Sequence, residues 1–314
     1  MKVIGAEEVA RRLTYAACIP LMREAMIALS AGRTKQLLRG IIDLDRGNAF
    51  GVMPGALDAS VQGGAFGAKL VSVFPGNVAK GGLSHQGLVL LFDPETGAPA
   101  AVIDAGELTA IRTAAASAAA TDALARPDAH RLAILGTGEQ ARRHIEAIRH
   151  VRPIDRVTIW GRDAHKAEAL AADLPADLGA EAAPDVAAAV AGADIVCTTT
   201  AAPEPILFAH QIAPGTHINL VGSSRAGPAE ADNALVARAR FFADHRAGVL
   251  AQGAEFLRAK AAGLVDDAHL LGEIGEVMAG TRPGRLTPQD VTIYKSLGSI
   301  VQDLAAAGWL VREA

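Results

Sequence analysis

Two glycines and an alanine give the middle of the chain a pattern that can bind phosphate. Gly136, Gly138 and Ala141 form a G-x-G-x-x-[GA] motif between an apolar run at 132–135 and a helical pattern at 139–150. The first glycine allows a tight turn, the second lets the backbone approach a pyrophosphate, and the small third residue lets helix and strand pack closely. Free N–H groups at the helix start favour negative charge. We expect a dinucleotide here, with a purely structural turn as the alternative.

The end of the next strand bears on the type of dinucleotide. NAD-binding proteins usually carry an acidic residue about 20 residues beyond the motif, where it binds the ribose hydroxyls. Here Gly161 and Arg162 stand at that point, and Asp163 follows. An arginine can pair with a 2′-phosphate, which a carboxylate would repel. The pattern favours NADP(H), while Asp163 keeps NAD(H) open and Arg162 can also be read as a solvated loop charge.

Three basic residues in the first third of the chain have apolar neighbours. Lys69 lies in a strand-like run with Val71 and Val73 on its face, Arg39 ends an apolar run, and Arg112 lies at the start of a small-residue helix. Each alone is more often a solvated surface charge. Three together, in a chain of net charge −4, are better explained by an anionic ligand. If they converge in space, a carboxylate is the simplest candidate.

The elements around these residues predict two kinds of sheet. Residues 40–104 show short strands without a helical period, as in an antiparallel sheet. From residue 131 on, strands alternate with helices, as in a doubly wound parallel sheet. A helix over Val291–Ala307 is expected to return to the first region. We therefore predict an α/β protein: a Rossmann-type dinucleotide domain at 120–286 and a discontinuous α+β substrate and dimerisation domain at 1–119 with 287–314.

Composition excludes several other classes. The 314 residues suit two packed units, and no basic stripe accompanies the net charge of −4, so nucleic acid is not an expected partner. No apolar run reaches the roughly 18 residues of a membrane span, and charges at the N-terminus argue against a signal peptide. Two distant cysteines fit a reducing cytoplasm, and nine scattered histidines predict no metal site.

Ordered motifs along nearly the whole chain resemble the ornithine cyclodeaminase/mu-crystallin family. They are Gly51-Val-Met-Pro54, Ala68-Lys69-Leu-Val, Ser84-His-Gln-Gly87, Thr109-Ala-Ile-Arg112-Thr-Ala-Ala, the Gly136 turn, Glu204-Pro-Ile-Leu-Phe208, His217-Ile-Asn-Leu-Val-Gly222 and Lys295-Ser-Leu-Gly298. The resemblance implies a homodimer joined through the sheets of the substrate domains. It also implies that Arg39, Lys69 and Arg112 bind a substrate carboxylate. The cofactor would be lined by Thr113, Gly136, Thr137, Gly138, Glu139, Gln140, Gly161, Arg162, Asp163, Thr198, Thr199, Thr200, Val221, Gly222 and Ser296.

Two departures from the cyclodeaminase pattern bear on the substrate. Ser224 stands where those enzymes carry an aspartate for the distal amine, and Gly51 stands where they carry a glutamate. A serine cannot supply the negative charge that a desolvated ammonium group needs. The chain resembles instead the branch that reduces cyclic imines. We expect NAD(P)H-dependent reduction of Δ1-pyrroline-2-carboxylate or Δ1-piperideine-2-carboxylate to L-proline or L-pipecolate, with Lys69 and Ser224 as catalytic residues.

Alternatives stay open at this stage. Ser224 can instead only bond backbone in a tight loop, and Trp160 and Tyr294 are expected to be packing residues. The activity can be that of ornithine cyclodeaminase, or of an alanine or opine-type amino-acid dehydrogenase of the same family. A non-catalytic protein that binds NADPH or a small carboxylate is the alternative from another class, although burying three cations argues for an anionic ligand.

Overall fold

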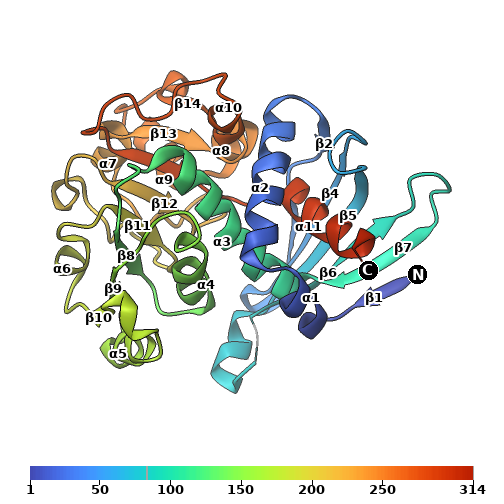
Figure 1. Cartoon of the computed structure of the whole chain (residues 1–314), viewed down its shortest axis with the longest axis horizontal. Helices are drawn as coiled ribbons and strands as arrows, with labels where there is room; N and C mark the ends of the chain where they lie inside the picture. Colours follow the sequence, from blue (N-terminus) through green and yellow to red (C-terminus); the bar gives the residue numbers. More distant parts are fainter. Residues whose placement is uncertain (83, 314) are drawn as a thin grey trace. The chain divides into compact units, whose positions relative to one another are not determined.

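The computed structural model of the chain describes residues 1–82 and 84–313, and it divides into two compact units. Unit 1 consists of Met1–Arg112 and Ser299–Ala314, and unit 2 of Thr113–Gly298. Each unit has its own sheet, one mixed and one parallel (Figure 1). The predicted fold class, a Rossmann-type parallel sheet with a second, discontinuous α+β region, is confirmed.

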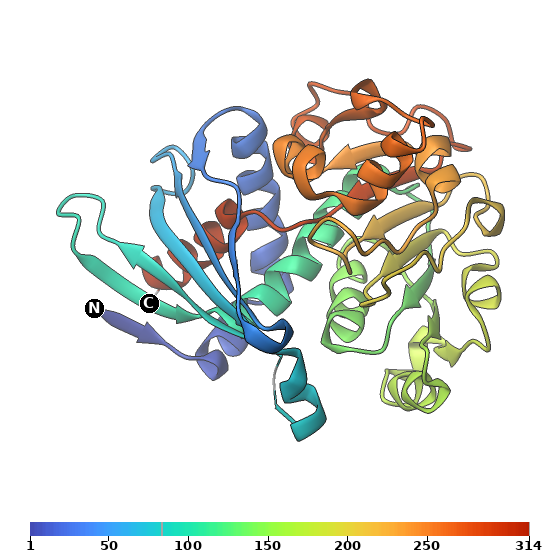
Figure 2. The same ribbon diagram turned by 180° about the vertical axis from the view of Figure 1, so that it is seen from behind.

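Unit 1 is a seven-stranded sheet with its helices packed on one face. The sheet has the order β1-β7-β6-β5-β4-β2, β3 also pairs with β4, and β1 is parallel to β7 while the other pairs are antiparallel. Helix α11 packs on β4, β5 and β6, and α2 packs on α11 (Figures 1 and 2). The strands are β1 Lys2–Ile4, β2 Thr34–Gln36, β3 Gly40–Asp43, β4 Ala49–Leu57, β5 Ala65–Val73, β6 His85–Phe92 and β7 Pro99–Asp104. The helices are α1 Ala6–Arg12, α2 Tyr15–Ser30 and α11 Ile300–Arg312, with short 3-10 turns η1 Asp45–Gly47 and η2 Pro75–Lys80.

The pleat of this sheet separates two apolar faces. On the α11 side, Met53, Lys69, Val89 and Ile103 stand side by side on four neighbouring strands, and all four are buried. Lys69 is thus the charged member of an apolar cross-strand row. The opposite face also carries apolar side chains. Leu88, for example, is 46% exposed there, and it is aligned through Leu70 with Val52.

Unit 2 is an eight-stranded parallel sheet of order β10-β9-β8-β11-β12-β15-β13-β14. The chain moves outward from β8 to β10 and then returns to β11 on the other side of β8. Ligands of such sheets bind outside the carboxyl ends of the strands where the order reverses. The strands are β8 Arg131–Leu135, β9 Arg156–Trp160, β10 Glu181–Ala182, β11 Ile195–Thr198, β12 His217–Leu220, β13 Arg240–Ala243, β14 Leu270–Glu273 and β15 Thr292–Lys295.

Helices cover both faces of this sheet. The second half of α3 and α4 lie on the face of Asn219, whose amide donates to Thr121 of α3, while His144 of α4 contacts Ser117. The other face is a core of strand residues and α6, α7 and α9 (Figure 1). The helices are α3 Ala105–Leu124, which crosses the division between the units, α4 Glu139–Ile148, α5 Ala164–Ala172, α6 Val186–Val190, α7 Asn233–Arg238, α8 Arg246–Gln252, α9 Ala254–Ala261 and α10 Ile274–Met278. The short 3-10 turns are η3 Ala176–Leu178, η4 Ala209–Gln211 and η5 Asp267–His269.

The predicted helix over Val291–Ala307 is wrong in its first half, whereas its residues from Ile300 on lie in helix α11. Its first part is strand β15, which lies between β12 and β13 and is buried throughout. Because both faces of this strand are buried, its apolar run does not alternate with polar residues, and the sequence pattern cannot distinguish it from a helix. Gly298 then adopts a φ of 80°, which L residues rarely do, and this ends the extended segment. Ser299 caps α11 by accepting from the N–H of Val301 at 3.3 Å.

Three further expectations need correction. Residues 36–42, whose sequence suggests one strand, form two strands, because Gln36 pairs with Gly55 and Gly40 with Val52, so the register against β4 shifts by one residue between them. Arg112 lies about two turns into α3, which begins at Ala105. Residues 287–290, whose sequence suggests a helix start, form a turn, which Asp290 closes by accepting from the N–H groups of Leu286 and Thr287. Beyond these expectations, strand β14 is an element that the sequence pattern does not predict.

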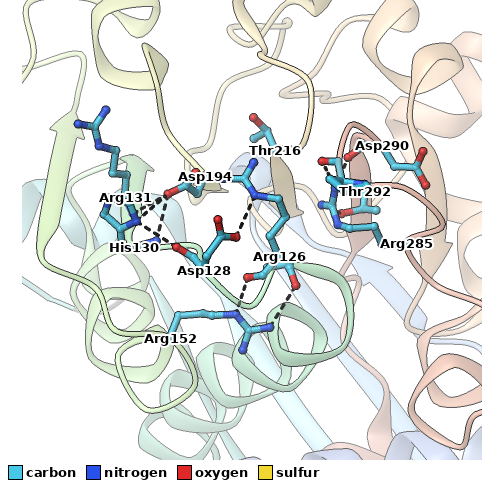
Figure 3. A network of polar contacts seen from close by, with 12 residues as sticks. Arg126, Asp128, His130, Arg131, Arg152, Asp194, Thr216, Arg285, Asp290 and Thr292 are labelled. Atoms are coloured by element: carbon cyan, nitrogen blue, oxygen red, sulfur yellow. Dashed lines mark hydrogen bonds and ion pairs between the residues drawn. The ribbon is translucent and has the colours of Figure 1, made fainter.

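A network of charges fastens the amino ends of the parallel strands (Figure 3). Asp194, just before β11, pairs with Arg126 at 2.5 Å and accepts from the backbone N–H groups of His130 and Arg131 at 3.0 Å. Asp290 and Arg285 lie before β15 in the same view. This edge is opposite the one that carries Gly136, so these charges hold the strands together away from the ligand edge.

Candidate active site

A buried ionic cluster in unit 1 contains two of the three predicted carboxylate ligands. The Lys69 ammonium lies 3.2 Å from Asp303 Oδ1 and donates to Thr109 Oγ1 at 2.6 Å. Arg112 donates through Nε to the same Asp303 oxygen at 2.9 Å and through Nη1 to Gln302 Oε1 at 3.1 Å. Lys69 and Arg112 are 5% and 4% exposed, and Asp303 is 0% exposed. Two buried cations therefore share one carboxylate, which leaves an excess of one positive charge.

The charges of this cluster perturb one another. Burial lowers the pKa of Lys69 to about 8; the Asp303 carboxylate opposes the shift, and Arg112 and Arg39 add to it. Burial raises the pKa of Asp303, but Arg112 and Lys69 outweigh this effect and hold that pKa below its usual value. Arg39 is half-buried and lies close enough to act on Lys69. The structure thus joins Lys69 and Arg112 through Asp303, and Arg39 acts on Lys69 through its charge.

Donors remain for a ligand in this cluster. The contacts above occupy two of the three N–H groups of Lys69, and Nε and Nη1 of Arg112. One Lys69 N–H and the second Arg112 amino group, Nη2, stay outside them. An ammonium and a guanidinium with unused donors in a buried, net-positive site can bind a carboxylate by charge-assisted hydrogen bonds.

In unit 2, the glycine turn lies where the strand order reverses. Gly136 has a φ of 133°, and a Cβ on it would meet Thr199 Oγ1 at 2.5 Å and the Thr199 carbonyl oxygen at 2.9 Å. Gly138 is the N-cap of α4, no side chain caps that helix end, and a Cβ on Gly138 would have open space. An uncapped helix start beside an open backbone fits the pyrophosphate of a dinucleotide.

Other predicted cofactor residues gather around this turn. Gly161 lies against Thr137, since a Cβ on Gly161 would overlap the Thr137 methyl group. Arg162 and Asp163 follow as exposed residues before α5. Glu139 and Gln140 form the first turn of α4.

Thr113, Ser296 and Val221 are predicted cofactor residues that lie outside the glycine turn itself. Thr113 is 8% exposed on α3 and has no contact with the turn among the described interactions. Ser296 follows β15 beside β12, with its N–H bonded to the Leu220 carbonyl and its buried Oγ without a described partner. Val221 lies beside Thr198, to whose carbonyl its N–H donates at 3.1 Å.

Trp160 and Tyr294, which the sequence predicts to be packing residues, both lie in strands of the parallel sheet. Tyr294 of β15 is fully buried. Trp160 of β9 is half-buried and packs against the core on one face of the sheet.

Sequence reasoning missed Glu230, a buried carboxylate that joins two strand ends. It accepts from Thr198 Oγ1 at 2.5 Å, from the Thr200 N–H and Oγ1 at 2.7 Å, and from the Gly222 N–H at 2.8 Å. Burial raises the pKa of Glu230. Its carboxylate thereby connects the predicted cofactor residues after β11 with those after β12. A lone acid between Ala229 and Ala231 was the available signal.

A buried ion pair, which the sequence pattern also did not predict, anchors the loop that carries Ser224. Lys295 of β15 and Glu255 of α9 are both 0% exposed, with Nζ 2.7 Å from Oε2. The same Lys295 ammonium donates to the Ser223 carbonyl at 2.7 Å. Ser224 is half-buried and follows directly on this anchored residue. The geometry therefore fixes the backbone from which Ser224 projects.

Two classes of site are not found in the described part of the chain. Within residues 1–82 and 84–313, no three histidine, cysteine or acidic side chains are grouped so that they could hold a metal ion. None of the helices in those ranges is long and apolar enough to cross a membrane. Cys18 and Cys197 are both buried free thiols.

Comparisons with known proteins agree over the full chain. The model of the ornithine cyclodeaminase/mu-crystallin family matches residues 2–314. The chain is 37% identical over 309 residues to ketimine reductase mu-crystallin of Mus musculus, covering 97% of this chain and 94% of that protein. It is 36% identical over 297 residues to Δ1-pyrroline-2-carboxylate reductase of Paracoccus denitrificans, covering 92% of each. The structure of Thermococcus litoralis Δ1-pyrroline-2-carboxylate reductase with NADH and L-proline has a TM-score of 0.95 at 30% identity, covering 100% of this chain and 97% of that one.

Proposed function

Because this chain belongs to the ornithine cyclodeaminase/mu-crystallin family, we propose that it is an NAD(P)H-dependent oxidoreductase acting on C=N bonds. Its substrate is a small cyclic ketimine carboxylate, Δ1-pyrroline-2-carboxylate or Δ1-piperideine-2-carboxylate, and its product is the cyclic L-amino acid. The names of two similar proteins, a ketimine reductase and a Δ1-pyrroline-2-carboxylate reductase, support this reaction class.

The single observation that carries the substrate class is the charge of the buried cluster in unit 1. Among the described residues, Lys69 and Arg112 have Asp303 as their shared ion-pair partner, so this pair of buried cations carries one uncompensated positive charge. Uncompensated buried charge is costly, and binding a monoanion removes it. A carboxylate of the substrate can accept from the unused donors of Lys69 and Arg112, with the half-buried Arg39 nearby.

The loop after β12 favours an imine over ornithine. Gly222, Ser223, Ser224 and Arg225 offer no carboxylate to hold a distal ammonium group, and Arg225 would repel one. A cyclic ketimine has no such group. Ornithine cyclodeaminase and amino-acid dehydrogenase activity are therefore the lesser candidates.

The nicotinamide cofactor supplies the hydride when it is bound. The chain contributes the glycine turn and the uncapped start of α4 for the pyrophosphate. Arg162, exposed beyond β9, is proposed to pair with a 2′-phosphate, so that NADP(H) is preferred and NAD(H) is the alternative. The exposed Asp163 beside it limits the expected degree of discrimination.

The residues of the cluster act by orientation and charge. Lys69, Arg39 and Arg112 hold the carboxylate, and this fixes the position of the C=N carbon for hydride addition. The imine nitrogen must also gain a proton. Ser224, on its anchored loop, is proposed to relay that proton through an ordered water. Lys69, with a pKa of about 8, keeps its ammonium form at neutral pH and so preserves the charge that binds the substrate.

The outer face of the unit 1 sheet supports a homodimer. Val52, Leu70 and Leu88 form one apolar row there, and Phe66 and Phe92 stack with ring centroids 5.6 Å apart. An apolar sheet face of this kind in a folded chain is typical of an interface. We propose that two copies associate through this face.

The test is nicotinamide absorbance with purified protein. NADPH and Δ1-pyrroline-2-carboxylate should give NADPH oxidation and L-proline, whereas NAD and ornithine should give neither reduction nor ammonia. Release of ammonia from ornithine would reject the proposal. For the cofactor, Arg162→Ala should weaken the binding of NADPH more than the binding of NADH. Arg156→Ala, at the other end of β9, serves as the matched control and should weaken neither.

A further inference from the structure

We propose that Asp303 is a positioning residue, which holds Lys69 and Arg112 as a cationic pair directed at the substrate carboxylate. The inference rests on the proposed function, since it concerns the same site. Nothing in the sequence motifs pointed to this aspartate. It lies in α11, far along the chain from Lys69 on β5 and Arg112 on α3.

The geometry supports a positioning role. One oxygen of Asp303, Oδ1, receives both the Lys69 ammonium at 3.2 Å and the Arg112 Nε at 2.9 Å. Gln302, the preceding residue, accepts from Arg112 Nη1 at 3.1 Å. These contacts tie both cationic side chains to neighbouring residues of α11, so that removing the Asp303 carboxylate removes the one atom to which both are bonded.

The charges require this carboxylate as well. Without Asp303, the ammonium of Lys69 would lie buried among Arg112 and Arg39, with Thr109 Oγ1 as its remaining polar partner. Burial and both arginines favour the neutral amine, whereas Asp303 is the charged group that favours the ammonium among the described residues that act on Lys69. Cys18 of α2 faces Arg112, and burial raises the pKa of its thiol to about 12, so it brings no negative charge to the cluster near neutral pH.

The alternative role is purely structural, in which Asp303 only stabilises α11. The two roles differ in what a substitution changes. A structural role predicts lower stability without a change in the pH at which substrate binding fails. A positioning role predicts that this pH falls, because Lys69 loses its proton more readily when the neighbouring carboxylate is gone.

The experiment compares Asp303→Asn, Asp303→Glu and the control Asp194→Asn with the wild type. Asp194 also forms a largely buried ion pair, with Arg126, at the amino edge of the parallel sheet. kcat and KM for Δ1-pyrroline-2-carboxylate with saturating NADPH are measured from about pH 6 to about pH 9.5, a range that spans the expected titration of a lysine shifted by burial. Asp303→Asn should raise KM on the order of 10-fold or more, with a smaller change in kcat, and should move the alkaline limb of kcat/KM to lower pH.

Asp303→Glu keeps the charge, so it should return the alkaline limb toward the wild-type position even if the longer side chain leaves KM raised. Asp194→Asn should change neither KM nor the limb. If Asp303→Asn keeps the wild-type KM and the wild-type position of the alkaline limb of kcat/KM, the proposal is overturned. An equal rise in KM in Asp194→Asn would overturn it too, because a general loss of stability would then explain the effect.

A second measurement needs no substrate. The Lys69 pKa of about 8 lies below its ordinary value of 10.5, so its contribution to stability rises with pH between these values. In Asp303→Asn this rise should begin at a lower pH, as a steeper increase of Tm between about pH 7 and about pH 8 than in the wild type. Equal slopes would overturn the proposal. Absence of wild-type imine reduction would reject the proposed function alone, and the Tm comparison would still decide the role of Asp303.

Discussion

Replacing Glu255 by glutamine removes the counter-charge of a fully buried ammonium. Lys295 and Glu255 are each 0% exposed, and their charged atoms lie 2.7 Å apart. The lysine also donates to the Ser223 carbonyl at 2.7 Å, which anchors the loop that carries Ser224. We therefore expect Glu255→Gln to reduce both the stability of unit 2 and the order of that loop.

The magnitude follows from the burial of both groups. Breaking a fully buried pair by removing one partner costs about 3–5 kcal/mol, since the remaining charge stays desolvated. For a unit of this size, each kcal/mol corresponds to about 2–4 °C in Tm, so Glu255→Gln should lower Tm by about 6–20 °C. The double variant Glu255→Gln with Lys295→Met removes both charges of this pair and leaves one Ser223 carbonyl without its donor, at about 1–3 kcal/mol, so it should be less destabilised than Glu255→Gln. The buried Glu230 carboxylate, on which Lys295 also acts, keeps its hydrogen bonds from Thr198, Thr200 and Gly222 in both variants.

Differential scanning calorimetry of the wild type and the variants measures this effect. Glu204→Gln is the matched control, because Glu204 forms an ion pair with Arg258 of the same helix α9 at the surface, where such pairs contribute at most about 1 kcal/mol. If Glu255→Gln lowers Tm by no more than Glu204→Gln does, the buried pair does not have the expected effect on stability. A double variant less stable than Glu255→Gln would also refute the reasoning.

Three further predictions use other parts of the structure. Gly136→Ala should weaken dinucleotide binding by at least about 10-fold in a calorimetric titration, because its Cβ would meet the Thr199 carbonyl; unchanged affinity would argue against a role of this turn. Leu88→Glu should convert the proposed dimer to monomer in light scattering, because it places a charge on the apolar sheet face, and a persistent dimer would place the interface elsewhere. Burial lowers the pKa of His144 to about 4 and of His217 to about 3. The free energy of unfolding should therefore fall as pH decreases below about 6.5, by up to about 1.4 kcal/mol per pH unit for each histidine. A denaturant midpoint that stays flat from about pH 6.5 to about pH 5 would contradict this.

Local patterns were sufficient to predict the general architecture. The glycine turn and the alternation of strands and helices predicted a Rossmann-type sheet, because each βαβ unit is formed by neighbouring residues. The apolar surroundings of Lys69 and Arg112 indicated a buried anion site. Both features are visible within a few residues of the chain, which is why they could be recognised without a structure.

The missed features depend on contacts between distant segments. Asp303 reads as a polar position in an amphipathic helix until it is paired with Lys69, 234 positions away along the chain. Glu230 connects two strand ends that only the sheet brings together. The sequence pattern predicts a helix at strand β15 because a strand buried on both faces has no alternation to show its period.

The most direct test of the account compares two imines that differ by one carboxylate. kcat/KM with NADPH is measured for Δ1-pyrroline-2-carboxylate and for Δ1-pyrroline, in the wild type and in Arg112→Ala. We expect the wild type to prefer the carboxylate by on the order of 100-fold or more, and Arg112→Ala to lose most of this preference through a higher KM. Equal rates for the two imines in the wild type would contradict the claim that the buried cations recognise the substrate carboxylate.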